Sequence, residues 1–238
     1  MFLALFGLSL TSCSNDDDDN NVSNISIKLD EIGEKNAKEA VAGTDLHIAA
    51  TILADAQIKT LKVEIKNAEG KTIVAKDYSS GDKYKGLKKA MFHEHLDIPE
   101  NTVAGLYTFV MTVTDTKNKT VNAQEKLTIK AIDPNAPKIT ELIIGDGQRK
   151  AKPGQKLLVK ATVETKAAVK KIEIELHGSK EYPFDIKGYE GKTGKFSVET
   201  EITVPAEAAA GTYHVHFSVE DSRDRETTVE IKDFSIQR

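Results

Sequence analysis

Cysteine and tryptophan are almost absent from this chain of 238 residues, which has one cysteine and no tryptophan. A single cysteine forms neither an intramolecular disulfide nor a cysteine-rich metal site. Aromatic residues make up only 6% of the chain, so the usual ring platforms on which sugars and bases stack are scarce. These absences disfavour a disulfide scaffold and a stacking-based binder of glycans or nucleic acids.

Positive charge is not in excess either. The chain has 33 Lys and Arg against 37 Asp and Glu, a formal net charge of −4. Four of the acids form the run 16–19, so the rest of the chain carries equal numbers of basic and acidic residues. A neutral body does not neutralise phosphates in bulk, and we therefore expect no nucleic-acid partner.

Sequence signatures of catalysis are also missing. The chain has no Gly-x-Ser-x-Gly elbow and no glycine-rich phosphate loop, which are the local patterns that position a serine nucleophile or a phosphate. The single cysteine, Cys13, is better explained as a lipid attachment site. We therefore expect a protein that is not an enzyme.

The N-terminal segment resembles the leader of a bacterial lipoprotein. The uncharged apolar run Phe2–Leu10 is too short to span a bilayer but has the length of a signal-peptide core. It is followed by Leu10-Thr11-Ser12-Cys13, which resembles a lipobox, whose cysteine receives a diacylglyceryl thioether. We predict a signal peptide over 1–12, lipidation of Cys13 and membrane attachment through that lipid.

A polar, acidic stretch follows Cys13. Residues 13–23 bury too little apolar surface to offset their chain entropy, so they are predicted to form a disordered tether. The acidic run also resembles the export signal of surface-exposed lipoproteins in Bacteroidota, while a plain solvated spacer is the alternative. Residue 14 is serine rather than the aspartate tied to inner-membrane retention. The expected location is the outer membrane, with display at the cell surface.

Beyond the tether the hydrophobic pattern has a period of two. Segments such as Leu46–Ile52, Leu61–Ile65 and Tyr107–Val113 alternate apolar and polar residues, and turn-forming residues lie between them. Such alternation is typical of strands with one buried face. The fold class is therefore predicted to be all-β, built from antiparallel sandwiches.

The chain also repeats itself. The spacing of proline, glycine, tyrosine and aspartate over Leu96–Asp115 recurs over Ile202–Asp221, which indicates a tandem duplication. We predict a first domain over 24–132, a proline-stiffened linker over 133–137 and a second domain over 138–238.

The repeated pattern resembles the corner between strands E and F of immunoglobulin-like domains, in which a tyrosine hydroxyl caps backbone groups as the chain changes sheet. Two tandem immunoglobulin-like domains are therefore expected. The six residues of the two predicted corners are Pro99, Gly105 and Tyr107, and Pro205, Gly211 and Tyr213.

Two histidine pairs stand out. His93 and His95, and likewise His214 and His216, are two residues apart in predicted strands, so each pair projects from one face at a spacing of about 7 Å. If alternate apolar residues point inward, both pairs lie on exposed faces, where they suit zinc or copper. A polar face that merely uses histidine, and a pH-sensitive contact surface, remain alternatives. His47 and His177, which have no partner in sequence, are expected to be ordinary surface residues.

The segments around these pairs, Phe92–Pro99 and Gly211–His216, resemble a family of lipoprotein domains of unknown function in Bacteroidota. In that family a His-x-His strand precedes the proline corner and a Tyr-His strand follows it. Each repeat here keeps a different half. The second repeat has glutamates at positions 199 and 201, which correspond to the first pair.

We therefore expect a surface-anchored binding module for a metal ion or metal complex. The alternative is an adhesion or accessory protein that contacts another envelope protein or a glycan, with the histidines incidental.

Overall fold

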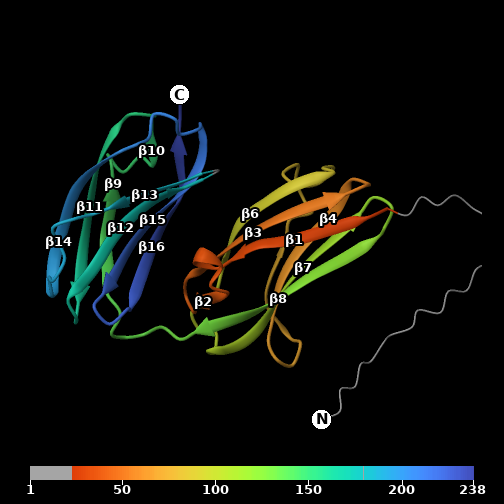
Figure 1. Ribbon diagram of the computed structural model, residues 1–238, viewed down its shortest axis with the longest axis horizontal. Coiled ribbons are helices and arrows are strands. Elements are labelled where there is room, and N and C mark those ends of the chain that lie inside the picture. The colour runs from red at the N-terminus through yellow and green to blue at the C-terminus, as the bar shows by residue number, and fades with distance from the viewer. Residues whose placement is uncertain (1–22, 179) are drawn as a thin grey trace, which may run out of the picture. The chain divides into compact units, whose positions relative to one another are not determined.

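The computed structural model describes residues 23–178 and 180–238. It divides into two units, Met1–Ala131 and Ile132–Arg238, and each is a sandwich of two sheets (Figure 1). The predicted signal peptide, Cys13 and all of the predicted tether except Ser23 lie outside the described residues. Within the described residues, no helix is long and apolar enough to cross a bilayer.

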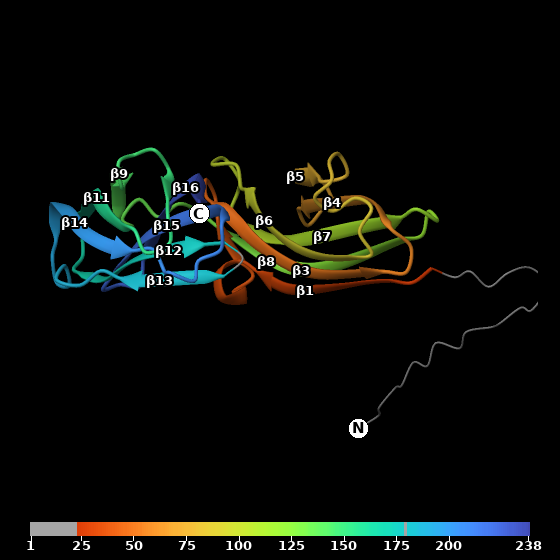
Figure 2. The same ribbon diagram turned by 90° about the horizontal axis from the view of Figure 1, so that it is seen from above.

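In the first unit a three-stranded sheet, in the order β1-β3-β6, packs face to face against a five-stranded sheet, in the order β2-β8-β7-β4-β5 (Figure 2). All pairings are antiparallel except that of β2 with β8. The elements are β1 (Ile25–Ile32), the 3-10 turn η1 (Glu34–Asn36), β2 (Glu39–Val41), β3 (Asp45–Ala54), β4 (Ile58–Lys66), β5 (Thr72–Asp77), β6 (Lys89–Asp97), β7 (Gly105–Asp115) and β8 (Thr120–Lys130).

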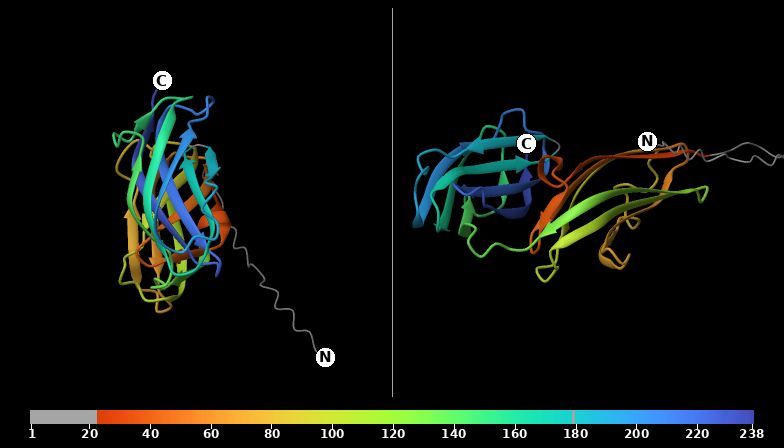
Figure 3. Two further views of the ribbon diagram at one scale, coloured as in Figure 1. Left: turned by 90° about the vertical axis from the view of Figure 1, so that its left-hand side faces the viewer. Right: turned by 60° about the horizontal axis from the view of Figure 1, so that its bottom comes forward.

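The second unit repeats this arrangement. A three-stranded sheet, in the order β14-β11-β9, packs against a five-stranded sheet, in the order β10-β16-β15-β12-β13. Figure 3 shows the strands of this unit, coloured green to blue, from two further sides. Here too one edge strand, β10, runs parallel to its neighbour. The strands are β9 (Lys138–Ile144), β10 (Lys150–Ala151), β11 (Lys156–Thr165), β12 (Val169–His177), β13 (Glu181–Asp185), β14 (Gly194–Thr203), β15 (Gly211–Asp221) and β16 (Glu226–Ile236).

In the first unit β3 and β6 lie in one sheet and β4, β7 and β8 lie in the other; in the second unit β11 and β14 lie opposite β12, β15 and β16. This distribution of strands is that of an immunoglobulin-like sandwich. The predicted fold class, two tandem immunoglobulin-like domains, is confirmed. The predicted boundary falls next to the division between the units, and linker residues 133–137 form a short turn at the start of the second unit.

Each core forms because alternate residues of facing sheets are apolar. In the first unit Ile48 and Ile52 of β3 oppose Val63 of β4 and Met111 of β7, and all four are fully buried. In the second unit Val159, Ile174 and Phe217 are the buried counterparts. The hydrophobic effect therefore fixes which face of each strand points outward, and the histidines lie on the outward faces.

Both predicted corners have the tyrosine hydrogen bond. The Tyr107 hydroxyl donates to the carbonyl of Val103 at 2.6 Å, and the Tyr213 hydroxyl donates to the carbonyl of Ala209 at 3.0 Å. Tyr213 is buried, whereas Tyr107 is partly exposed. Each bond holds the start of its strand, β7 in the first unit and β15 in the second, against the preceding loop.

Ser23, which the sequence pattern places in the tether, belongs to the first sandwich. It is buried, its hydroxyl donates a hydrogen bond to Asp115, and its oxygen accepts one from the backbone N–H of Ala56 at 3.3 Å. The chain is thus fixed to the fold one residue earlier than the predicted boundary at residue 24.

Candidate metal centres

Three histidines lie on the outer face of the three-stranded sheet of the first unit. His47 of β3 is directly opposite His95 of β6, and His93 lies opposite Ala49 in the same ladder. Since side chains opposite each other in an antiparallel ladder have Cβ atoms about 4.5–5.5 Å apart, this register brings the three imidazoles together.

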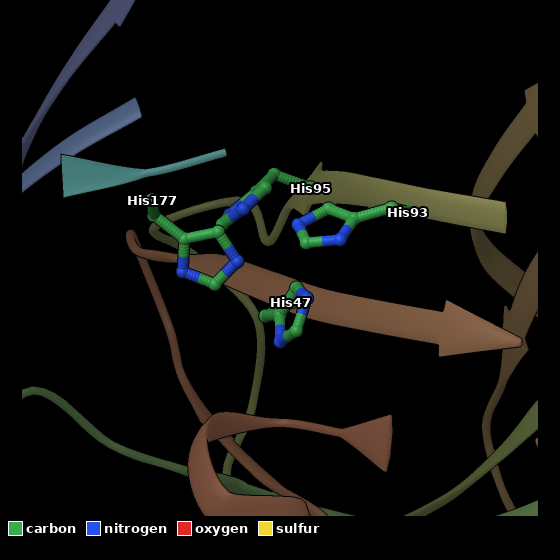
Figure 4. Close-up of side chains that lie close together, drawn as sticks. All are labelled: His47, His93, His95 and His177. Atoms are coloured by element: carbon green, nitrogen blue, oxygen red, sulfur yellow. The ribbon is translucent and has the colours of Figure 1, made fainter. Parts of the chain in front are cut away.

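The rings converge, as Figure 4 shows for His47, His93 and His95. The ring centroid of His47 lies 4.8 Å from that of His93 and 5.1 Å from that of His95, and the centroids of His93 and His95 are 6.2 Å apart. One nitrogen from each ring lies within 4.8 Å of the others. Around a tetrahedral ion with bonds of about 2.0–2.1 Å, such nitrogens lie about 3.3 Å apart. The nitrogens of the three rings are therefore within 4.8 Å of one another, and the rings would have to move closer together to share one ion.

Two carboxylates lie behind these rings. The Nδ1 of His95 is hydrogen-bonded to Asp45, and the Nδ1 of His47 lies 3.8 Å from a carboxylate oxygen of Glu31. A carboxylate on one ring nitrogen fixes the tautomer and the ring orientation, and it raises the basicity of the other nitrogen. The hydrogen bond to Asp45 therefore fixes the orientation of the His95 ring.

The structure corrects two expectations for this unit. His47 is not an ordinary surface residue: it is 9% exposed and joins the pair that the sequence identified. His95 is not on an open face either, since it is 7% exposed. The register of β3 against β6 explains why His47 joins the pair, because it places this histidine, from a distant part of the sequence, directly opposite His95.

In the second unit, His214 and His216 lie on the outer face of β15 and belong to a different cluster. His214 is hydrogen-bonded through Nδ1 to Glu230 of β16. The ring of His216 lies 5.3 Å from that of His177 on β12. His177 is only 4% exposed, so the expectation that it is an ordinary surface residue is also wrong. Both histidines of the predicted pair are half-buried rather than exposed.

The glutamates that replace the first pair in the second unit bind lysines instead. Glu199 and Glu201 lie on β14, and their carboxylates are 3.1 Å from Lys160 and 2.6 Å from Lys156 of β11. They lie in the sheet opposite to that of His214 and His216. Within this unit the glutamates and the histidine pair therefore do not form one site.

Two tyrosines in the loops of the first unit, Tyr78 and Tyr84, pack in or against its core. Tyr84 is 3% exposed, and its ring packs on Phe92 with centroids 5.2 Å apart. Its hydroxyl donates to Glu94 at 2.6 Å. Burial raises the pKa of Tyr84 and also that of Tyr78, with the negative charge of Glu94 acting in the same direction.

Two solved structures resemble the chain at 12% sequence identity and a TM-score of 0.30 each. One is an ICAM-5 D1–D4 ectodomain fragment, with 89% of this chain and 53% of that chain covered. The other is a tetra-tandem repeat in the extending region of a large adhesion protein, with 90% and 48% covered. The chain thus spans about half the length of these structures.

No curated protein matches the sequence. A family model does match it twice, over residues 11–130 and 120–234, and the model describes a domain of unknown function, DUF4625. The two matched segments together cover most of the chain and correspond to its two sandwiches. The chain therefore belongs to the DUF4625 family and contains two consecutive copies of its domain.

Proposed function

We propose that this protein is a non-catalytic binding module, anchored by lipid at the bacterial cell surface, that binds a transition-metal ion through His47, His93 and His95. The observation that carries the proposal is the convergence of three imidazoles on one face of the sheet, one of them hydrogen-bonded through Nδ1 to a carboxylate. Three imidazoles suit zinc and copper.

Binding rather than catalysis is the simplest use of this arrangement. The group consists of three imidazoles with Asp45 and Glu31 behind two of them, and none of these five residues is a serine or cysteine nucleophile. The ligands stand on two strands of a hydrogen-bonded sheet, which holds their spacing.

Equilibrium dialysis of the purified chain against Zn²⁺ and Cu²⁺ tests the metal site. We expect the variant H47A/H93A/H95A to lose one equivalent of bound metal per chain, whereas K89Q, a change on the same face of β6 outside the cluster, keeps it. D45N is expected to weaken binding about 10–100-fold, because it removes the carboxylate that orients His95. Unchanged binding in the triple variant would refute the metal site and favour an adhesion role.

The anchor is tested separately. We expect the intact mass of protein extracted from membranes to include acyl chains on Cys13, and C13S to be released from the membrane fraction. Protease added to whole cells should degrade the wild-type chain if it is displayed at the surface. An unmodified Cys13 thiol in membrane-extracted protein would exclude the lipid anchor without bearing on the histidines.

A further inference from the structure

The outer face of the five-stranded sheet of the second unit has a second cluster, built from three strands. In the ladder, Glu175 of β12 lies opposite His216 of β15, and His216 lies opposite Glu230 of β16. The next row pairs His177 with His214. Two adjacent rows therefore place three imidazoles and two carboxylates side by side.

Three of these groups have the spacing of metal ligands. The Nδ1 of His177 lies 2.8 Å from a carboxylate oxygen of Glu175, and the rings of His177 and His216 are 5.3 Å apart. Glu175, His177 and His216 each offer a ligand atom within 4.8 Å of the others. All three belong to one sheet of one unit, and they contribute two nitrogens and one oxygen.

His214, which the sequence assigns to the metal site, has another role. Its Nδ1 is hydrogen-bonded to Glu230, whose side chain is only 8% exposed. A carboxylate oxygen of the same Glu230 lies 3.8 Å from Nε2 of His216. Glu230 is therefore hydrogen-bonded to His214, and His177 is the histidine that we group with His216 in the ligand set.

We propose that Glu175, His177 and His216 form a second metal site, which binds a divalent first-row ion such as Zn²⁺ or Fe²⁺. Two imidazoles and one carboxylate form the ligand set of one class of zinc enzyme sites and of non-haem iron sites. Its ligand set differs from that of the three-histidine group of the first unit in having an anionic oxygen ligand. Because carboxylate ligands also suit Mn²⁺, this site discriminates less against Mn²⁺ than the three-histidine site.

The position of the cluster also suits an ion. The side chain of His177 is buried with Glu175 on one side and with Glu181 on the other, where a carboxylate oxygen lies 3.6 Å from Nε2. Several carboxylates around buried imidazoles repel one another unless a positive charge is present. A divalent cation supplies that charge, and so does a proton on histidine, which makes a metal-free His–Glu ladder the competing explanation.

The test uses the full chain carrying H47A/H93A/H95A, so that the first site is removed. In this background we expect one Zn²⁺ per chain by equilibrium dialysis and elemental analysis. Adding H177A/H216A should abolish binding, and adding E175Q should weaken it at least 10-fold, because the amide oxygen is a poorer ligand than a carboxylate. E220Q, which removes a carboxylate from the same face of β15 outside the cluster, is the matched control. Far-UV circular dichroism checks that each variant is folded.

Mn²⁺ provides a second measurement, because its electron paramagnetic resonance signal falls when the ion is bound. We expect Mn²⁺ to bind to the H47A/H93A/H95A background and to be lost with E175Q. Zinc binding that H177A/H216A leaves unchanged, or that E220Q reduces equally, would overturn the second site. If H177A/H216A alone removes one equivalent while H47A/H93A/H95A removes none, the second site stands and the proposed function of the first unit fails.

Discussion

The buried aspartate at the end of β15 offers a sharp test of what stabilises the second sandwich. The Asp221 carboxylate is fully buried and accepts hydrogen bonds from the backbone N–H groups of Arg223 at 2.9 Å and Arg225 at 3.2 Å. It also accepts two from the Arg225 guanidinium, at 2.8 and 2.6 Å. This one side chain therefore closes the turn between β15 and β16.

We predict that D221N lowers the free energy of unfolding of the second unit by about 3–5 kcal/mol, the usual cost of removing one partner of a buried ion pair. Asparagine keeps one oxygen for the backbone donors but presents an amide N–H₂ to the guanidinium. Since domains are typically stable by about 5–15 kcal/mol, this single change removes a large share of the stability of the unit.

The first unit provides an internal comparison. Asp115 occupies the same place in its turn and accepts from the backbone N–H groups of Lys117 and Lys119 at 2.9 Å each, but its other donor is the hydroxyl of Ser23 rather than a guanidinium. We therefore expect D115N to cost less, about 1–3 kcal/mol, the penalty for disturbing hydrogen bonds to a buried charged group.

The effect of D221N should depend on pH. Burial raises the pKa of the Asp221 carboxyl, but Arg225 and the backbone donors lower it further, so the pKa in the folded state lies below its usual range. A group of this kind stabilises the fold above its unfolded pKa of about 3.9 and loses that contribution as the pH falls through the folded value. The difference in the free energy of unfolding between wild type and D221N is therefore largest near pH 7 and becomes smaller below about pH 4.

Hydrogen exchange measured by mass spectrometry resolves the two units, since peptides from each report their own opening free energy. We expect D221N to speed exchange in β12, β15 and β16 and to leave β3 and β7 unchanged. The reasoning is refuted if D221N costs less than D115N, or if its cost is the same at pH 7 and pH 3.

Three further predictions concern packing and buried hydroxyls. A Cβ on Gly178 would lie 2.5 Å from the ring of Tyr213, so G178A is expected to destabilise the second unit by about 1–3 kcal/mol in thermal unfolding, as overpacked sites do. We expect Y213F to lower the free energy of unfolding, measured with urea, more than Y107F does. The reason is that water replaces the lost hydrogen bond only at the partly exposed Tyr107. Y84F should cost about 1–3 kcal/mol and raise exchange in the loop before β6, because it leaves Glu94 without a buried donor.

Much of the fold was predictable because its signals are local. Alternation along Leu46–Ile52 identifies a half-buried strand without reference to its neighbours, and the repeated spacing of Pro99, Gly105 and Tyr107 identifies the corner and the duplication. The same local rule placed each histidine pair on the outward face of its strand. These features depend on spacing within one short segment, which a sequence displays directly.

The composition of the candidate sites was not predictable, because it depends on which strands are neighbours and in what register. Nothing near His47 in the sequence indicates that it lies opposite His95, and a shift of one residue would have sent it into the core. In the same way, His177 ends β12 and meets β15 only through the ladder. The hydrogen bond of His214 to Glu230 was not predictable for a related reason, since Glu230 comes from a third strand.

The two sandwiches have the same arrangement of strands, and each has its own core of the same kind. Their outer faces differ: histidines cluster on the three-stranded sheet of the first unit and on the five-stranded sheet of the second. In the first unit the histidine cluster lies on β3 and β6, where the second unit has the ion pairs of Glu199 and Glu201 with lysines. In the second unit the cluster lies on β12 and β15, where Val110 of the first unit replaces His216 and is buried.

A core position constrains both copies alike, because the same cavity must be filled, whereas an outer face is free to change in either copy. If the histidines were incidental polar residues, their changes would be scattered over these faces. Instead, each unit gathers them in adjacent rows with carboxylates at Nδ1 of His95 and His214. On each sheet the histidines therefore lie in a cluster with carboxylates, which is the arrangement from which we propose the two metal sites.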